Sequence, residues 1–109
     1  MVGDPTVVRG EIWWAATPGG ERPVLVLTRD PVANRIGVVV VAACTRTVRG
    51  LMSELPLGPD DGMTEDCVAS FDNLHTLRKD RFRRRIATLP PDRDSELCTA
   101  LDAALGCPR

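Results

Sequence analysis

Val38-Val39-Val40-Val41-Ala42-Ala43-Cys44-Thr45 decides the fold, because the stretch opens with four β-branched residues and stays apolar almost to its end. β-Branched side chains suit the pleated, half-buried surface of a sheet. The run extends back to Ile36, and a continuous apolar run of this length is typical of a strand covered on both faces. We therefore expect residues 36–45 to form the central strand of a sheet.

Another strand is expected before this run, over residues 7–16. Apolar and polar side chains alternate there with the period of two that a half-buried strand requires. The alternation places two sets on opposite faces, namely Ile12, Trp14 and Ala16 against Glu11 and Trp13. One indole ring is therefore expected in the core and the other facing outward.

Turn residues divide the remaining strands. The loop Thr17-Pro18-Gly19-Gly20-Glu21 ends the first strand, because proline and paired glycines break regular structure. The next strand spans residues 23–28 and starts at Pro23, since proline cannot donate to a ladder. Two more strands, 51–57 and 67–71, flank a polar turn. Short strands divided by such turns predict a mainly β fold, an antiparallel barrel or sandwich.

A helix is expected near the end of the chain, behind Pro91 in its first turn. Acidic residues suit the positive end of the helix dipole there, and Gly106 and Pro108 end the helix. Pro90 stands where a capping serine would stabilise the first turn. The side chains expected to be buried across the sheet follow helical spacing: Leu97, Leu101 and Leu105.

The composition is that of one ordinary globular domain, which we expect to span residues 1–109. No apolar run approaches the roughly 20 residues of a membrane span, and no secretory signal is visible, so we expect a cytoplasmic protein without membrane contact. The spacing of the four cysteines lacks the paired pattern of a zinc site. We interpret Cys44, Cys67, Cys98 and Cys107 as reduced structural thiols.

Positive charge is concentrated in one segment. The formal net charge is only −1, yet six of the 14 cationic residues lie within residues 78–85. Such a run is either a solvated loop or a surface for phosphate groups, and a phosphate surface would bind less tightly as salt is raised.

Several motifs, in this order and spacing, resemble the MazF/PemK family of bacterial toxin endoribonucleases. The likeness runs from Arg9 to Gly106 and is carried by Arg9-Gly10-Glu11-Ile12-Trp13-Trp14-Ala15, Arg22-Pro23-Val24-Leu25-Val26-Leu27, Cys44-Thr45, Arg49-Gly50-Leu51, Asp66-Cys67-Val68, Asp72-Asn73-Leu74-His75-Thr76, Arg84-Arg85-Ile86 and Ala100-Leu101 to Leu105-Gly106. The resemblance implies an SH3-like antiparallel β-barrel of the MazF/CcdB type with a C-terminal helix, a homodimer, and a MazE-like antitoxin as partner. It also implies sequence-specific cleavage of single-stranded RNA without a metal or cofactor, which inhibits translation and growth.

The resemblance gives Arg22 and Thr45 the catalytic positions. An arginine fork fits phosphate oxygens, and a threonine hydroxyl adds a neutral donor to the same group. The family attributes proton transfer to this arginine as well, but a guanidinium is very hard to deprotonate in a protein. We therefore interpret Arg22 as a clamp on the scissile phosphate.

Other residues are expected to contact the RNA. Arg46 departs from the family, where a small polar residue is common, and could either strengthen phosphate binding or change the preferred sequence. The outward tryptophan ring could stack on a base or, if it is Trp13, contact a second subunit. The expected RNA-binding residues are Glu21, Arg46, Thr47, Arg49, Asn73, Arg78, Lys79 and Arg81.

His75 is the sole histidine and stands where relatives carry arginine. Its ordinary pKa of about 6.5 suits a general base at neutral pH, so we consider assistance in removing the 2′-hydroxyl proton against a merely structural role. Two further interpretations stay open for the chain as a whole. One is a gyrase poison like the CcdB proteins, against which Arg22 and Thr45 argue. The other is a non-catalytic SH3-like module, which the short loop before Arg22 and the presence of Arg46 would favour.

Overall fold

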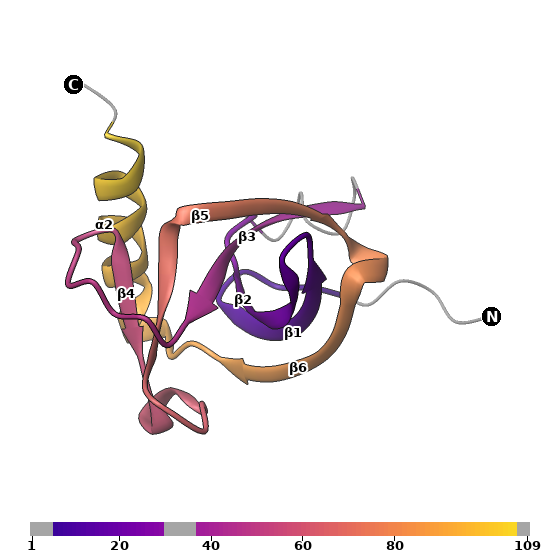
Figure 1. The fold of residues 1–109 in the computed structure, drawn as a ribbon, viewed down its shortest axis with the longest axis horizontal. Helices are drawn as coiled ribbons and strands as arrows, with labels where there is room; N and C mark the ends of the chain where they lie inside the picture. Colours follow the sequence, from indigo (N-terminus) through magenta and orange to yellow (C-terminus); the bar gives the residue numbers. More distant parts are fainter. Residues whose placement is uncertain (1–5, 30–36, 107–109) are drawn as a thin grey trace.

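The computed structural model describes residues 6–29 and 37–106, which form one curled antiparallel sheet with a helix beside it (Figure 1). The strands lie in the order β4-β5-β3-β2-β1-β6. The element bounds are β1 Glu11–Thr17, β2 Gly20–Val26, β3 Val38–Thr45, β4 Glu54–Leu57, η1 Pro59–Asp61, β5 Cys67–Arg78, η2 Lys79–Arg81, β6 Phe82–Thr88, η3 Pro91–Arg93 and α2 Asp94–Leu105. The expected mainly β, antiparallel barrel with a C-terminal helix is thus confirmed as a six-stranded half-barrel.

The central strand is where the apolar run predicted it. β3 pairs with β2 on one side and β5 on the other, although Ile36 lies outside the described residues. The hairpin before it differs from the prediction, because β2 starts at Gly20 and Pro23 lies inside the strand, opposite Trp14. Proline is tolerated there because the ladder between β2 and β3 begins only at Val24, which leaves Pro23 with a sheet partner on one side.

Charged side chains concealed the last strand. The segment Arg83-Arg84-Arg85 forms part of β6, at the edge of the sheet beside β1, and the alternative of a solvated loop is wrong there. Edge strands of natural sheets often carry charges, which hinder pairing with another chain. The three arginines are exposed accordingly.

β5 is also longer than expected, twelve residues in place of the five at 67–71. Its pairing with β3 shifts between Ala42 and Ala43, which skips Phe71-Asp72-Asn73 on the β5 side. Such a bulge bends the strand and re-aims its side chains. The two adjacent polar residues within it interrupt the period of two, which is why the sequence suggested that the strand ended there.

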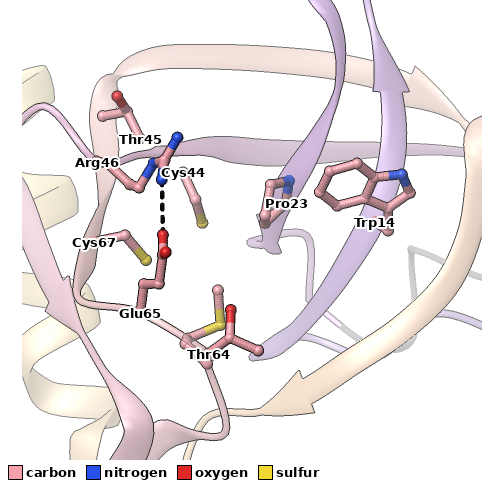
Figure 2. Close-up of a pocket in the computed structure, with 9 residues that line it drawn as sticks. Trp14, Pro23, Cys44, Thr45, Arg46, Thr64, Glu65 and Cys67 are labelled. Atoms are coloured by element: carbon pink, nitrogen blue, oxygen red, sulfur yellow. Dashed lines mark hydrogen bonds and ion pairs between the residues drawn. The ribbon is translucent and has the colours of Figure 1, made fainter.

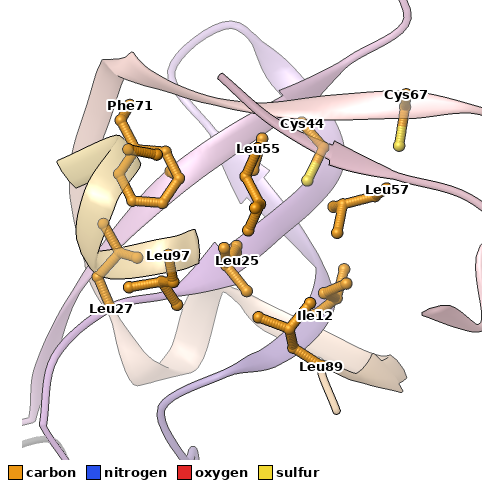
Figure 3. Packing of buried hydrophobic residues seen from close by; sticks show 13 residues of the cluster. Ile12, Leu25, Leu27, Cys44, Leu55, Leu57, Cys67, Phe71, Leu89 and Leu97 are labelled. Atoms are coloured by element: carbon orange, nitrogen blue, oxygen red, sulfur yellow. The ribbon is translucent and has the colours of Figure 1, made fainter. Parts of the chain in front are cut away.

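The sheet has an apolar cluster on each face. The first, between sheet and helix, includes Ile12, Leu25, Leu55, Phe71 and Leu97 (Figure 3). The second lies inside the curl and includes Val24, Val41, Leu77, Phe82 and Trp13.

The two indole rings lie on opposite faces of the sheet, one buried and one more exposed, as the alternation predicted. Trp13 is the buried ring, 9% exposed, and packs edge-on against Phe82 with ring centroids 5.8 Å apart. Its Nε1–H donates to Glu11 over 3.1 Å. Trp14 is the half-buried ring and points to the other face.

The helix α2 packs beside β4 and β5 on its Leu97 side. Leu101 is half-buried, but Leu105 is 59% exposed, so the prediction of burial is wrong for this last turn, which extends beyond the sheet. Gly106 ends the helix with a φ of +57°, a left-handed conformation that suits glycine.

A short ion pair joins the start of the helix to the turn after β4. Arg93 Nη1 lies 2.7 Å from Asp61 Oδ2, and both side chains are largely buried. A second arginine nitrogen donates to the carbonyl oxygen of Pro56 and to Glu96, each over 2.8 Å. The pair therefore connects η1, β4 and α2. No helix in the described part of the chain is long and apolar enough to span a membrane.

Candidate active site

Arg22 and Thr45 lie side by side at one end of the sheet. The ladder between β2 and β3 pairs Val24 with Ala43, and continuing that register by two residues sets Arg22 opposite Thr45. Arg22 is two residues from Val24, and Thr45 is two residues from Ala43. Because side chains alternate along a strand, both lie on the face of the sheet that carries Val24. The two residues also line one cavity of about 320 Å³, referred to below as the Arg22 cavity.

The Arg22 cavity gathers part of the predicted site. Its lining consists of Arg22, Thr45, Thr47, Arg49, Glu54, Ser70, Asp72 and Asn73. Five of these residues are predicted site residues, and they come from three separate segments of the chain. The cavity therefore combines two arginines and several neutral hydrogen-bonding groups with the carboxylates of Glu54 and Asp72. Both carboxylates accept hydrogen bonds from the protein itself, and the arginine and hydroxyl donors are the groups that suit an anion.

The guanidinium of Arg22 is held without a carboxylate partner. Its Nε is buried and makes no hydrogen bond within the described parts of the chain. Gly19, at the tip of the β1–β2 hairpin, lies against the same group, since a Cβ there would stand 3.4 Å from Nη2 of Arg22. Buried donors are normally paired, so this unpaired Nε beside a cavity calls for an explanation such as a bound water or ion.

The hydroxyl of Thr45 is oriented by the backbone that follows it. The N–H of Thr47 donates to Thr45 Oγ1 over 3.1 Å. Because this bond uses a lone pair of the oxygen, the hydroxyl hydrogen stays available to donate into the cavity. Thr45 is the last residue of β3, so its side chain stands at the rim of the sheet.

Glu54 is a member of the site that sequence reasoning missed. It is 9% exposed, and its carboxylate accepts the N–H groups of Arg49 and Leu51 at 3.1 to 3.2 Å. These bonds fix the loop that carries Arg49 at the cavity. A lone glutamate at the start of a short strand gives no signal in the sequence, because the contact depends on how the loop folds back.

Asp72 was also missed, although it belongs to the motif that carries the family resemblance. The β5 bulge brings it and Asn73 to the cavity, and Asp72 accepts a hydrogen bond from the Ser53 hydroxyl. The interruption of alternation at these two residues is the signal that could have revealed the bulge.

Four predicted site residues lie away from the Arg22 cavity. His75 pairs with Val41, four strand residues and roughly 13 Å from Thr45 at the usual rise of a strand. Arg78 pairs with Val38, at the opposite end of β3 and roughly 23 Å from Thr45. Lys79, which is buried, and Arg81 follow it in η2. Nη2 of Arg78 lies 3.0 Å from Oδ2 of Asp80, so this ion pair partly neutralises the positive charge at that end of the sheet.

Arg46 lines a second cavity of about 310 Å³, referred to below as the Trp14 cavity (Figure 2). Arg46 Nη1 forms an exposed ion pair of 2.9 Å with Glu65. Glu21 lies just outside the lining and accepts the indole N–H of Trp14 over 2.8 Å. The complete lining is Trp14, Pro23, Cys44, Thr45, Arg46, Met63, Thr64, Glu65 and Cys67.

The two thiols in the Trp14 cavity are poor nucleophiles. Burial raises the pKa of Cys44, with a smaller contribution from Cys67 nearby. Burial also raises the pKa of Cys67, and the negative charges of Asp66, Asp61 and Glu65 add to the effect. Both groups therefore stay protonated at neutral pH, as structural thiols do. Cys98 is exposed, and Cys107 lies outside the described residues.

No group of three or more histidine, cysteine, aspartate or glutamate side chains in the described ranges is arranged to hold a metal ion.

Comparison with known proteins assigns this fold to one family. Residues 8–105 match the model of the PemK-like, MazF-like toxins of type II toxin-antitoxin systems, and the chain belongs to that family. A curated relative from Mycobacterium tuberculosis, named a probable endoribonuclease MazF2, is 62% identical over 91% of this chain and 98% of its own length. A second relative from that organism, the probable endoribonuclease MazF5, is 37% identical over 93% of this chain and 94% of its own.

Solved structures agree with the sequence relatives. The Mycobacterium tuberculosis toxin MazF-mt6 superposes with a TM-score of 0.84 at 33% identity, covering 91% of this chain and 99% of that one. A mycobacterial endoribonuclease solved in complex with its cognate antitoxin gives a TM-score of 0.83 at 28% identity, covering 94% and 98%. The identification of a MazF/PemK-family toxin from the sequence motifs is thus confirmed.

Proposed function

We propose that this chain is a sequence-specific, metal-independent endoribonuclease toxin that acts in the cytoplasm on single-stranded RNA. The observation that carries the proposal is the meeting of Arg22 and Thr45 in one cavity at the end of two neighbouring strands. The endoribonuclease names of the relatives support the same conclusion.

The proposed reaction uses a nucleophile that the substrate itself provides. The ribose 2′-oxygen attacks the adjacent phosphorus and loses its proton, while the bond from phosphorus to the 5′-oxygen breaks and that oxygen gains a proton. The products are a 2′,3′-cyclic phosphate and a 5′-hydroxyl. Because the attacking oxygen is already tethered beside its target, holding it in line lowers the barrier substantially. DNA lacks the 2′-hydroxyl and should not be cut.

Arg22 and Thr45 would stabilise the charge that develops on the non-bridging phosphate oxygens. The described residues form no ion pair with this guanidinium, so a phosphate would not have to displace a carboxylate from it. The Thr45 hydroxyl can add one further donor, because Thr47 already supplies the bond that the oxygen accepts. Donors aimed at developing charge are commonly the largest single contribution to such catalysis. Arg49, on the loop held by Glu54, would bind a neighbouring phosphate.

The test is to incubate purified protein with defined RNA and DNA oligonucleotides in chelator and to map the product ends. We expect cuts in RNA alone, ending in a cyclic phosphate, and a loss of at least about a hundredfold in rate for Arg22→Ala. Arg22→Lys keeps the charge but not the two-pronged fork, so it should recover only part of the activity. Arg81→Ala, at the far end of β3, is the matched control and should cut normally.

Other outcomes would assign the chain differently. Inhibition of DNA gyrase without any RNA cleavage would indicate a CcdB-like poison. No effect on either target would indicate a non-catalytic SH3-like module.

We further propose that the single domain of residues 1–109 acts as a homodimer and is neutralised by a MazE-like antitoxin. The mycobacterial endoribonuclease solved with its cognate antitoxin supports a partner of this kind. Sedimentation of the purified chain, alone and with a candidate antitoxin, tests both statements. A monomer at micromolar concentration would contradict the first, and unchanged RNA cleavage in the presence of every antitoxin encoded beside the gene would contradict the second.

A further inference from the structure

We propose that the Trp14 cavity binds a nucleobase of the RNA substrate, namely the base of a nucleotide that adjoins the scissile phosphate, and thereby sets part of the cleavage specificity. This inference rests on the proposed function. It assigns a role to a cavity that the phosphate chemistry at Arg22 does not use.

The position of the cavity is the first argument. Thr45 lines both cavities, because it ends β3 and stands between the two faces of the sheet. Arg22 shares its face, whereas Pro23 and Trp14, which are paired with each other, point to the opposite one. A phosphate held at Thr45 therefore has the Arg22 cavity on one side and the Trp14 cavity on the other.

The second argument is the shape and chemistry of the lining. Figure 2 shows the Trp14 indole at one end of the cavity and the Arg46–Glu65 ion pair at the other, with Pro23 and Cys44 between them. An aromatic ring with apolar neighbours accepts the face of a base, whatever the base. Thr64 and the Arg46–Glu65 pair offer donors and acceptors at the far end, where a base edge would lie. The volume of about 310 Å³ is in the range of small-ligand sites.

The third argument is that the indole ring is fixed in place before any ligand binds. Its N–H donates to Glu21 Oε1 over 2.8 Å, and the other oxygen of Glu21 lies 3.7 Å from Nε of Arg83. Three strands thus hold the ring. A ring that is half-buried and hydrogen-bonded at its edge keeps one face for stacking without losing further side-chain freedom.

The fourth argument is charge beside the ring. Arg84 pairs with Trp14 across β1 and β6, so its side chain lies on the same face. No ion pair to Arg84 is found in the described structure, and it is exposed. A cation at this place would bind the backbone phosphate of the nucleotide whose base enters the cavity.

The test uses the oligonucleotide whose cut has been mapped, with a 2′-deoxynucleotide at the cut so that it binds without reacting. Affinity is measured for this oligonucleotide and for versions that lack one base at each position around the cut. Trp14→Ala should weaken binding of the complete oligonucleotide by on the order of tenfold to a hundredfold. Removal of one particular base next to the cut should weaken binding to wild type by a similar factor. The same removal should not weaken binding to Trp14→Ala any further.

Trp13→Phe is the matched control, because Trp13 is buried on the other face and the chain has only two tryptophans. This variant should bind normally and leave Trp14 as the sole fluorescent reporter, which the complete oligonucleotide should quench and the base-deleted one should not. Trp14→Phe keeps a ring and should retain most of the affinity.

Three results would overturn the assignment. The first is that loss of a base and Trp14→Ala weaken RNA binding independently at every position. The second is that Trp14→Ala cuts the same RNA sites at the same rates as wild type. Trp14→Ala could also weaken antitoxin binding while leaving RNA binding intact, which would give the cavity to a protein partner. Failure of wild type to cut any RNA is a separate outcome, and it would overturn the proposed function itself.

Discussion

The N–H of Thr47 donates to the hydroxyl oxygen of Thr45 over 3.1 Å, so the chain that leaves β3 turns back to orient the residue that ends it. Because the hydroxyl oxygen accepts this bond, the hydroxyl hydrogen of Thr45 is free to point into the Arg22 cavity. The γ-methyl group of threonine further restricts rotation of the side chain, so the hydroxyl keeps this orientation.

Thr45→Val is expected to lower the RNA cleavage rate by about a hundredfold to a thousandfold, because it removes one donor from the developing phosphate charge while keeping the strand. Thr45→Ser retains the hydroxyl and should stay within about tenfold of wild type. Single-turnover cleavage of the mapped oligonucleotide measures both. Equal activity of the valine and serine variants would show that the hydroxyl has no part in the reaction.

His75→Gln is expected to leave the pH dependence of cleavage unchanged, because His75 lies roughly 13 Å along β3 from Thr45. Rates measured from pH 5.5 to pH 9 on the same oligonucleotide test this. If the variant lost a limb of the pH–rate profile that wild type shows, the general-base hypothesis for His75 would be restored.

Arg93→Met is expected to lower the free energy of unfolding by about 2 to 3 kcal/mol, because it leaves the nearly buried carboxylate of Asp61 without its partner. Urea denaturation measures the change. Glu96→Gln is the control: Glu96 is an exposed partner of the same arginine, and its loss should cost about 0.5 kcal/mol or less. Similar costs for the two variants would mean that burial does not strengthen the Asp61 pair.

Stability is expected to fall above about pH 9 because of the buried thiols. Burial raises the pKa of Cys44 and Cys67, so in this range the unfolded chain releases protons that the native chain keeps. The free energy of unfolding then decreases with pH by up to about 1.4 kcal/mol per unit for each thiol. The chain has no tyrosine, so few other groups titrate there.

Urea midpoints at pH 7.5, 9 and 10 measure this slope, and Cys44→Ala should reduce it. Cys98→Ser replaces an exposed cysteine and serves as the control. An unchanged slope in the Cys44 variant would remove that thiol as the cause.

Gly62→Ala is expected to cost about 2 kcal/mol, because Gly62 has a φ of +90° and a Cβ there would stand 2.8 Å from the Cβ of Ala87. Gly106→Ala isolates the backbone strain, since its φ is +57° and no atom lies within 4 Å of the added Cβ. The alanine at position 62 should therefore be the more destabilising of the two in thermal unfolding. The reverse order would show that Ala87 moves aside freely.

The strands and the helix could be predicted where one local rule applied. Four β-branched residues, 38–41, identified β3, and the proline and glycines at 18–20 identified the first hairpin. The proposed catalytic pair also came from the sequence, because Arg22 and Thr45 belong to local motifs. Their proximity is a matter of strand register, and the structure supplies that.

The errors arose where two effects competed. The charges of residues 83–85 suggested a loop, because exposure of an edge strand and exposure of a loop look alike in a sequence. Leu105 follows the helical spacing of the buried leucines, but the last turn of α2 extends beyond the sheet and leaves it exposed. Glu54 and Asp72 reached the cavity through a loop and a bulge, whose geometry depends on contacts distant along the chain.

The Asp61–Arg93 pair has a consequence for ligand binding. The segment that walls the Trp14 cavity, residues 63–65, follows directly after the turn that this pair anchors to α2. Immobilising a flexible side chain on binding costs about 0.5 to 1.5 kcal/mol. This segment is already anchored in the folded protein, so binding a base in the Trp14 cavity should cost little further conformational entropy there. More of the binding free energy then remains to discriminate between bases.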